Sequence, residues 1–237
     1  MRKSHLLAGL IAAALAPAAN AEFSANIGAT SNYLWRGVTQ TDDGAAVQGG
    51  IDYAHESGFY LGTWASNIDW GVGSSGVEVD FYGGYSGEYS FGNGNILGYD
   101  IGLIYYYYPD SAYDDSDFTE IYASGSYNWF EVGLAYTVDG DAPDDAPFSD
   151  GDLYYYASAS FDLGDGWSVG GTVGHYDFDS SSPYKYADDH IDDYTHGQLD
   201  VGKSVGDFGD FTFTVSTAEK ESLDDDTKFL VAWSKTF

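Results

Sequence analysis

The chain has 237 residues, no cysteine, and a formal net charge of -30 from 38 acidic and 8 basic side chains. This balance argues against nucleic acid as a partner, because phosphate binding requires clustered lysine and arginine. The lack of cysteine excludes a disulfide framework and a thiolate metal site. The 22 Tyr, 14 Phe and 6 Trp, together with 31 Gly, favour strands over helices and predict an all-β protein.

The first 21 residues predict a cleaved signal peptide. Arg2 and Lys3 precede an apolar run from Leu6 to Leu15, and Ala19-Asn20-Ala21 has the small-x-small pattern of a signal-peptidase site. The apolar run is too short to cross a membrane as a helix. We therefore expect an exported mature chain of residues 22–237, with a net charge of -32 because two basic residues are removed.

The mature chain has the pattern of a membrane barrel. No apolar run in it reaches the roughly 18 residues that a spanning helix needs, so insertion into a membrane would require a closed barrel. Segments of about ten residues instead alternate apolar with small or polar side chains, as strands do between lipid and water. The expected strands are 23–36, 45–54, 59–69, 77–86, 96–108, 118–126, 129–138, 152–161, 167–177, 193–204, 211–218 and 228–237. This pattern predicts a transmembrane antiparallel up-and-down β-barrel of about 12 strands.

Two of these segments have particular features. In the first, alternation places Tyr33 and Trp35 on the lipid-facing side and Arg36 on the opposite side. In segment 59–69, Trp64 is out of phase with Leu61, which predicts either a bulge or an error in the assumed register.

The connections between the expected strands alternate in length. Short turns such as His55–Gly58 and Tyr127–Asn128 alternate with longer acidic loops such as Pro109–Asp117 and Asp139–Gly151. Outer-membrane barrels have short periplasmic turns and longer external loops, so both termini should lie in the periplasm. The terminal Phe237 resembles the assembly signal of such barrels. The alternative is a soluble β-sandwich with its aromatic residues buried between two sheets.

Several sequence blocks resemble the TorF-type family of proteobacterial porins. They are Ser31–Gln40, Gln48–Tyr53, Glu56–Tyr60, Glu78–Tyr85, Tyr106–Pro109 and Thr119–Tyr122. The resemblance implies a location in the outer membrane of a Gram-negative bacterium and a pore, without specifying the solute. This chain departs from the family in its acidity and in the aspartate-rich segment 139–152.

The interior of such a barrel should be narrow and acidic. Barrels of about eight strands have filled interiors and those of about sixteen hold open channels, so about twelve predicts a constricted lumen for small solutes. The pore-lining candidates, from strand parity, are Arg36, Glu78, Asp80, Asp100, Glu120, Glu131 and Asp200. Their net negative charge predicts a preference for cations. Arg36 either sets up a transverse field at the constriction or pairs with a carboxylate and closes the first hairpin.

The acidic loops have two interpretations. They are either solvated surface or a site for divalent cations that also bridges to lipopolysaccharide phosphates. The weak metal candidates are Asp141, Asp144, Asp145, Asp150 and Asp152. No EF-hand spacing is present, and the sequence predicts no cofactor.

Other functions remain as alternatives. A non-conducting barrel would act as a structural or recognition protein through its acidic loops. A hydrolase on the barrel wall would use His175, His190 or His196, but no nucleophile motif accompanies them, so we expect no enzyme activity. The aromatic residues should form interfacial girdles, with a sugar path along Tyr105–Tyr108 or Tyr154–Tyr156 as the alternative. The expected partners are outer-membrane lipid, lipopolysaccharide, and small solutes or ions.

Overall fold

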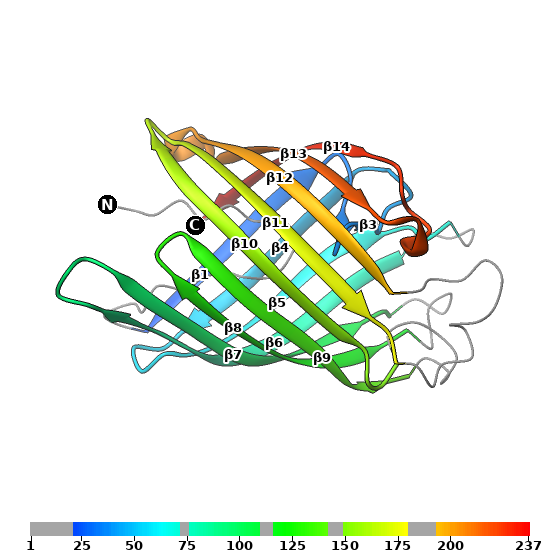
Figure 1. Ribbon diagram of the computed structural model, residues 1–237, viewed down its shortest axis with the longest axis horizontal. Helices are drawn as coiled ribbons and strands as arrows, with labels where there is room; N and C mark the ends of the chain where they lie inside the picture. Colours follow the sequence, from blue (N-terminus) through cyan, green and yellow to red (C-terminus); the bar gives the residue numbers. More distant parts are fainter. Residues whose placement is uncertain (1–20, 72–75, 110–115, 142–148, 180–192) are drawn as a thin grey trace.

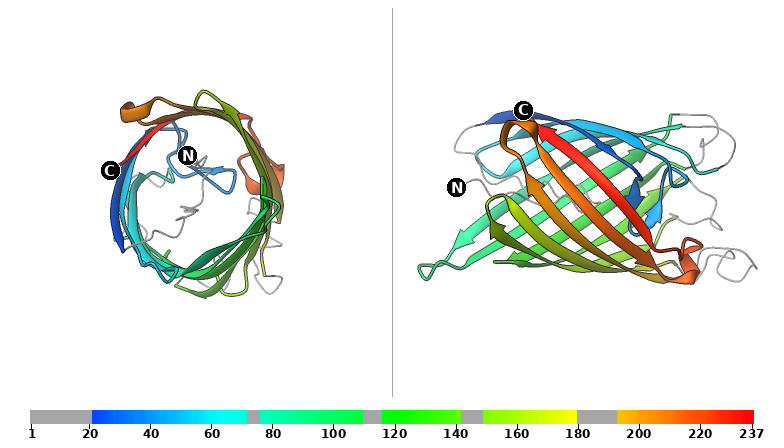
Figure 2. Two further views of the ribbon diagram at one scale, coloured as in Figure 1. Left: turned by 90° about the vertical axis from the view of Figure 1, so that its left-hand side faces the viewer. Right: turned by 90° about the horizontal axis from the view of Figure 1, so that it is seen from above.

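The computed structural model describes residues 21–71, 76–109, 116–141, 149–179 and 193–237. Twelve antiparallel strands follow one another around a closed barrel, and β1 pairs with β14 to complete the ring (Figures 1 and 2). The strands are β1 (Glu22–Thr30), β4 (Ala46–Ala54), β5 (Phe59–Ile68), β6 (Gly76–Ser90), β7 (Ile96–Tyr107), β8 (Phe118–Tyr127), β9 (Phe130–Gly140), β10 (Leu153–Gly164), β11 (Trp167–Asp177), β12 (Tyr194–Ser204), β13 (Asp210–Ala218) and β14 (Lys228–Thr236). The predicted fold and strand number are confirmed.

The barrel has an apolar outer face and a polar inner face. Outward side chains such as Leu199 and Phe229 are 67% and 66% exposed. Inward side chains of the same strands, such as Asp200 and Leu230, are buried. This arrangement is the reverse of that in a soluble β-sandwich, whose apolar side chains lie between two sheets. No helix among the residues described here is long and apolar enough to cross a membrane.

Tyrosines lie flat against glycines on the inner wall. A Cβ atom at Gly62 would lie 2.6 Å from the ring of Tyr82 on the next strand, and one at Gly133 would lie 2.5 Å from the ring of Tyr156. Glycine therefore leaves space for a tyrosine of the neighbouring strand. The tyrosine hydroxyls reach inward carboxylates: Tyr156 donates to Glu131 at 2.6 Å, and Tyr82 donates to Asp52.

The prediction of a first strand over residues 23–36 is wrong for residues 31–36. Strand β1 ends at Thr30, which pairs directly with Ala46 of β4, so residues 31–45 leave the wall. They enter the barrel, where β2 (Leu34–Trp35) and β3 (Val38–Thr39) form a small hairpin. Figure 2 shows this blue hairpin inside the ring of strands. The side chains of Tyr33 and Trp35, expected to face lipid, are buried inside.

Of the two alternatives for segment 59–69, a bulge or an error in the assumed register, the bulge is wrong. Strand β5 pairs with β4 and β6 without a shift in register. Trp64 and Ile68 point inward, in phase with Tyr60, because they pack against the cluster that includes the hairpin. Because Trp64 is a large aromatic residue on the inner face of the wall, the sequence pattern suggested a change of phase that the strand does not have.

The two ends of the barrel differ. At the end where β1 begins and β14 ends (Figure 2), β4 and β5 are joined by residues 55–58, β8 and β9 by 128–129, and β10 and β11 by 165–166. At the other end, residues 219–227 join β13 to β14 and include a short 3-10 helix, η4 (Lys220–Ser222). A second short 3-10 helix, η3 (Gly206–Phe208), lies in a turn at the first end. The first of these is the turn end of the barrel, and the other is the loop end.

Candidate functional site

The hairpin inside the barrel is shaped by its own turn. Arg36 and Gly37 have φ angles of 49° and 88° and lie between the paired residues Trp35 and Val38. Positive φ at both central positions is the requirement of a type I′ turn, which matches the twist of a two-residue hairpin. The chain can therefore reverse sharply inside the lumen and present Arg36 at the tip.

The charged tip is held by a buried carboxylate of β8. The Nη1 and Nη2 atoms of Arg36 donate to the two carboxylate oxygens of Glu120 at 2.8 and 2.6 Å. The guanidinium carbon lies 4.1 Å from the ring centre of Trp35, 4.3 Å from that of Tyr154 and 5.0 Å from that of Tyr176. Such a bidentate, stacked arrangement suits the planar guanidinium group in particular.

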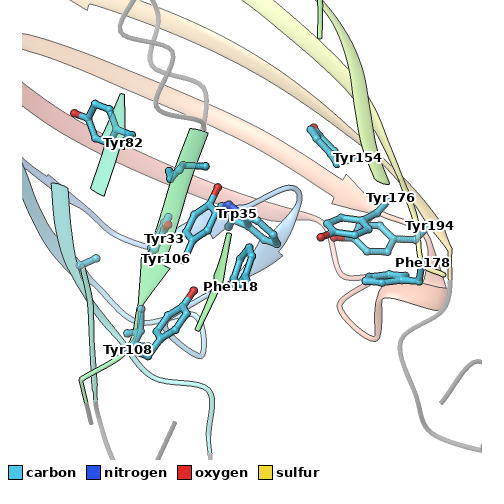
Figure 3. Close-up of a cluster of buried hydrophobic side chains, with 14 residues drawn as sticks. Tyr33, Trp35, Tyr82, Tyr106, Tyr108, Phe118, Tyr154, Tyr176, Phe178 and Tyr194 are labelled. Atoms are coloured by element: carbon cyan, nitrogen blue, oxygen red, sulfur yellow. The ribbon is translucent and has the colours of Figure 1, made fainter. Parts of the chain in front are cut away.

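Aromatic side chains surround the tip. Figure 3 shows Tyr176, Tyr194 and Phe178 grouped together, and Trp35, Tyr106 and Phe118 as a neighbouring group. Phe178 stacks on Tyr176 with ring centres 4.3 Å apart, and Tyr106 stacks on Phe118 at 4.2 Å. These contacts bury the ion pair and reduce its contact with water.

A second anchor joins the hairpin to β6. The Tyr33 hydroxyl donates to Glu78 at 2.8 Å, and the Tyr108 hydroxyl donates to the other oxygen of Glu78 at 3.2 Å. The ring of Tyr33 also packs edge-on against Trp64 of β5. Both Glu78 and Glu120 therefore accept hydrogen bonds from the inserted segment.

The opposite side of the inserted segment is tied to the last strands. The backbone N–H of Thr39 donates to Asp224 at 2.8 Å. Lys228, the first residue of β14, contacts Asp224 at 2.7 Å and Asp43 at 2.8 Å. The Tyr194 hydroxyl of β12 donates to the carbonyl oxygen of Arg36 at 3.1 Å. The segment 31–45 is thus attached to both β6–β8 and β12–β14, and it crosses the lumen.

Burial and charge fix the protonation of the hairpin groups. Burial opposes the charge on Arg36, but the Glu120 carboxylate outweighs this effect and keeps the pKa of Arg36 above its usual value. Burial, reinforced by the nearby charge of Glu78, raises the pKa of Tyr33 well above its ordinary range. The guanidinium therefore stays charged and the phenol stays neutral.

Comparisons with known proteins agree with this architecture. Residues 14–237 match the family described as "Bacterial protein of unknown function (Gcw_chp)". The chain belongs to this family. No curated protein matches the chain.

Two of the solved structures with a similar fold align over most of both chains. One, titled KdgM porin, is 10% identical with a TM-score of 0.57, over 90% of this chain and 99% of that one. The other, an outer membrane channel from Pseudomonas putida F1, is 13% identical with a TM-score of 0.53, over 91% of this chain and 95% of that one. At these identities the likeness concerns the fold.

The predicted site residues fall into two sets. Arg36, Glu78 and Glu120 come together at the hairpin, although Arg36 is on the inserted segment and not on the wall. Asp100, Glu131 and Asp200 lie on the inner wall toward the turn end, where Asp100 accepts from Tyr60 at 2.7 Å and Asp200 accepts from Thr214 at 2.6 Å. Asp80 is buried on β6 between the two sets, and its Oδ1 atom has no hydrogen-bond partner.

Three residues of the site, Asp52, His196 and Lys228, are not among the predicted pore-lining residues, although His196 is one of the histidines considered for a hydrolase. Asp52 is buried on the inner wall of β4, and the same parity that selected Asp100 would have found it. His196 accepts or donates a hydrogen bond with the Tyr154 hydroxyl at 2.8 Å and lies against Gly37. The contacts of His196 with Gly37 and of Lys228 with Asp43 depend on the path of the inserted segment, which strand parity does not describe.

The structure describes only three of the five weak metal candidates, Asp141, Asp150 and Asp152. Asp144 and Asp145 lie outside the described residues, as does His190. Among the residues that are described, no group of three or more acidic, histidine or cysteine side chains is arranged to hold a metal ion. The Asp152 carboxylate accepts a hydrogen bond from the backbone of Asp179, so it has a structural contact.

The prediction that the aromatic residues form interfacial girdles is wrong for Trp35 and Trp70. Trp35 is inside the barrel, and Trp70 donates to Gln40 of the inserted segment at 2.8 Å. Trp129 and Trp167, at the turn end, are 55% and 48% exposed, as girdle residues would be. Aromatic residues thus serve both the outer surface and the lumen.

Proposed function

We propose that this protein is a narrow, cation-preferring outer-membrane channel for the passive diffusion of small solutes, of the TorF type. The observation that supports this proposal most strongly is that the segment 31–45 crosses the lumen and narrows a barrel whose inner wall is acidic. The outer apolar face fits lipid, and the fold is that of two known outer-membrane proteins. Residues 1–21 act as the signal peptide in this proposal.

The balance of charges around the hairpin supports a preference for cations. Its two basic groups are already paired, Arg36 with Glu120 and Lys228 with Asp43 and Asp224. On the wall toward the turn end, Asp52, Asp100 and Glu131 have tyrosine hydroxyls as partners. A hydroxyl group leaves the negative charge uncompensated, so these carboxylates attract cations and repel anions.

The experiment is a reversal-potential measurement in planar bilayers with asymmetric KCl. The wild-type channel should give a potential of the sign expected for K⁺ permeation. A variant with Asp100→Asn, Glu131→Gln and Asp200→Asn should move this potential toward zero. Asp162→Asn serves as the matched control, because Asp162 is exposed near the turn end of β10.

Three results would overturn parts of the proposal. An anion-selective wild type, or a triple variant with unchanged potential and intact folding, would remove the cation preference. A folded barrel that never conducts would favour a structural or surface-recognition protein. Lipopolysaccharide is an expected neighbour in the outer leaflet, and its binding is separate from conduction.

A further inference from the structure

The guanidinium of Arg36 lies in a cage that is made largely by the barrel wall. Its carboxylate is that of Glu120 on β8, and two of its aromatic faces are Tyr154 on β10 and Tyr176 on β11. These three wall residues are 0–1% exposed. A carboxylate flanked by aromatic faces is the arrangement that binds organic cations through ion pairing and cation–π attraction.

The wall residues of the cage have supports that do not involve Arg36. Tyr154 is hydrogen-bonded to His196 and stacks on its ring. Tyr176 stacks on Phe178, and Glu120 accepts from the Tyr106 hydroxyl at 3.2 Å. Because each wall group is positioned by neighbours on the wall, the cage should persist when the hairpin tip leaves it.

The hairpin tip fills this cage imperfectly. The Nε atom of Arg36 is buried and has no hydrogen-bond partner, although a buried donor normally has one. Arg36 also holds a φ angle of 49°, in the left-handed region that non-glycine residues adopt less readily. A free guanidinium compound would have neither the tether nor the backbone constraint.

We propose that this cage is a binding site for guanidinium-type organic cations, and that Arg36 occupies it as a built-in ligand. A solute of this class displaces Arg36 and thereby releases the tip of the hairpin from Glu120. Planarity, delocalised charge and paired N–H donors distinguish this class from compact ammonium ions. The role of the cage in solute passage rests on the proposed channel function, whereas binding itself does not.

The first test is calorimetric titration of ethylguanidinium chloride into detergent-solubilised Arg36→Ala protein. Saturable binding is expected, at least ~10-fold tighter than in the wild type, because in the wild type Arg36 occupies the site for most of the time. Ethylammonium chloride should bind more weakly. Adding Glu120→Gln to Arg36→Ala should abolish the binding of ethylguanidinium.

Lys228→Ala is the matched control. It removes the basic side chain of β14 that holds the inserted segment through Asp43, and its contact with Asp224, but it leaves Arg36 in the cage. This variant should gain no ethylguanidinium binding. Equal gains in Lys228→Ala and Arg36→Ala would show that general loosening, and not an empty cage, creates the site.

A second measurement uses the wild-type protein, so it does not depend on the folding of a variant. Ethylguanidinium should increase amide hydrogen exchange of residues 34–39, and ethylammonium at the same concentration should not. Unchanged exchange of these residues at concentrations that saturate the wild type in the same calorimetric titration would overturn displacement. Absence of binding to correctly folded Arg36→Ala would overturn the cage.

These readouts separate the cage from the channel. Calorimetry and hydrogen exchange in detergent require no current. Binding by a barrel that does not conduct would refute the channel and keep the cage, whereas conduction without binding would refute the cage and keep the channel.

Discussion

At the scale of single residues, the buried pair of Arg36 and Glu120 determines where the inserted segment lies. Both side chains are almost completely buried, and each compensates the charge of the other. Removing one partner of a buried ion pair typically costs about 3–5 kcal/mol, because the remaining charge is left without compensation. The hairpin can respond by leaving the lumen, while the strands of the barrel stay paired.

Glu120→Gln should therefore release the hairpin without unfolding the barrel. Hydrogen exchange of residues 34–39 should become much faster, while exchange in β8 and its neighbours stays slow. Glu131→Gln is the matched control, since Glu131 also faces inward but its hydrogen bond is to Tyr156. Protection of residues 34–39 that survives in Glu120→Gln would contradict the anchoring role.

Gly37→Ala should also displace the hairpin. Gly37 has a φ angle of 88°, and a Cβ atom there would lie 2.5 Å from Cβ of His196. The substitution adds both backbone strain and a steric clash, so exchange of the hairpin amides should rise. Gly92→Ala, where the new Cβ meets nothing within 4 Å, should leave exchange unchanged. Equal exchange of the hairpin amides in the two variants would argue against close packing of Gly37 on His196.

At the scale of elements, strand periodicity was sufficient for the wall but not for the inserted segment. The alternation of apolar and polar residues locates all twelve wall strands because each faces lipid-like and lumenal surroundings in turn. Residues 31–45 break this rule, since both Tyr33 and Arg36 are enclosed by the barrel. Their neighbours are set by tertiary contacts with Glu78 and Glu120, which sequence spacing does not reveal.

The inner-wall glycines provide a prediction at the same scale. A Cβ atom at Gly84 would lie 2.5 Å from the carbonyl oxygen of Ile101 on the next strand. Because backbone atoms cannot rotate away, Gly84→Ala should lower stability by about 1–3 kcal/mol, the usual cost of overpacking. Urea unfolding from lipid vesicles measures this change. Gly125→Ala, with open space around the new Cβ, should be close to neutral, and similar losses for both would contradict the packing argument.

At the scale of the whole molecule, the strongly negative charge of the chain should control which ions pass. Screening lengths fall from about 10 Å at 0.1 M salt to about 3 Å at 1 M. The preference for cations should therefore weaken as the mean salt concentration rises at a fixed concentration ratio. Reversal potentials recorded at several salt levels check this. A selectivity that is independent of salt would indicate discrimination by close contacts instead of the overall field.

The constriction by residues 31–45 is the central claim, and single-channel conductance tests it most directly. Thr30 and Ala46 are register partners, so a two-residue Asn-Gly turn can replace residues 31–45 and join β1 to β4. The account predicts a small conductance for the wild type and a clearly larger one for the shortened, folded barrel. Equal conductances for the two proteins would contradict it.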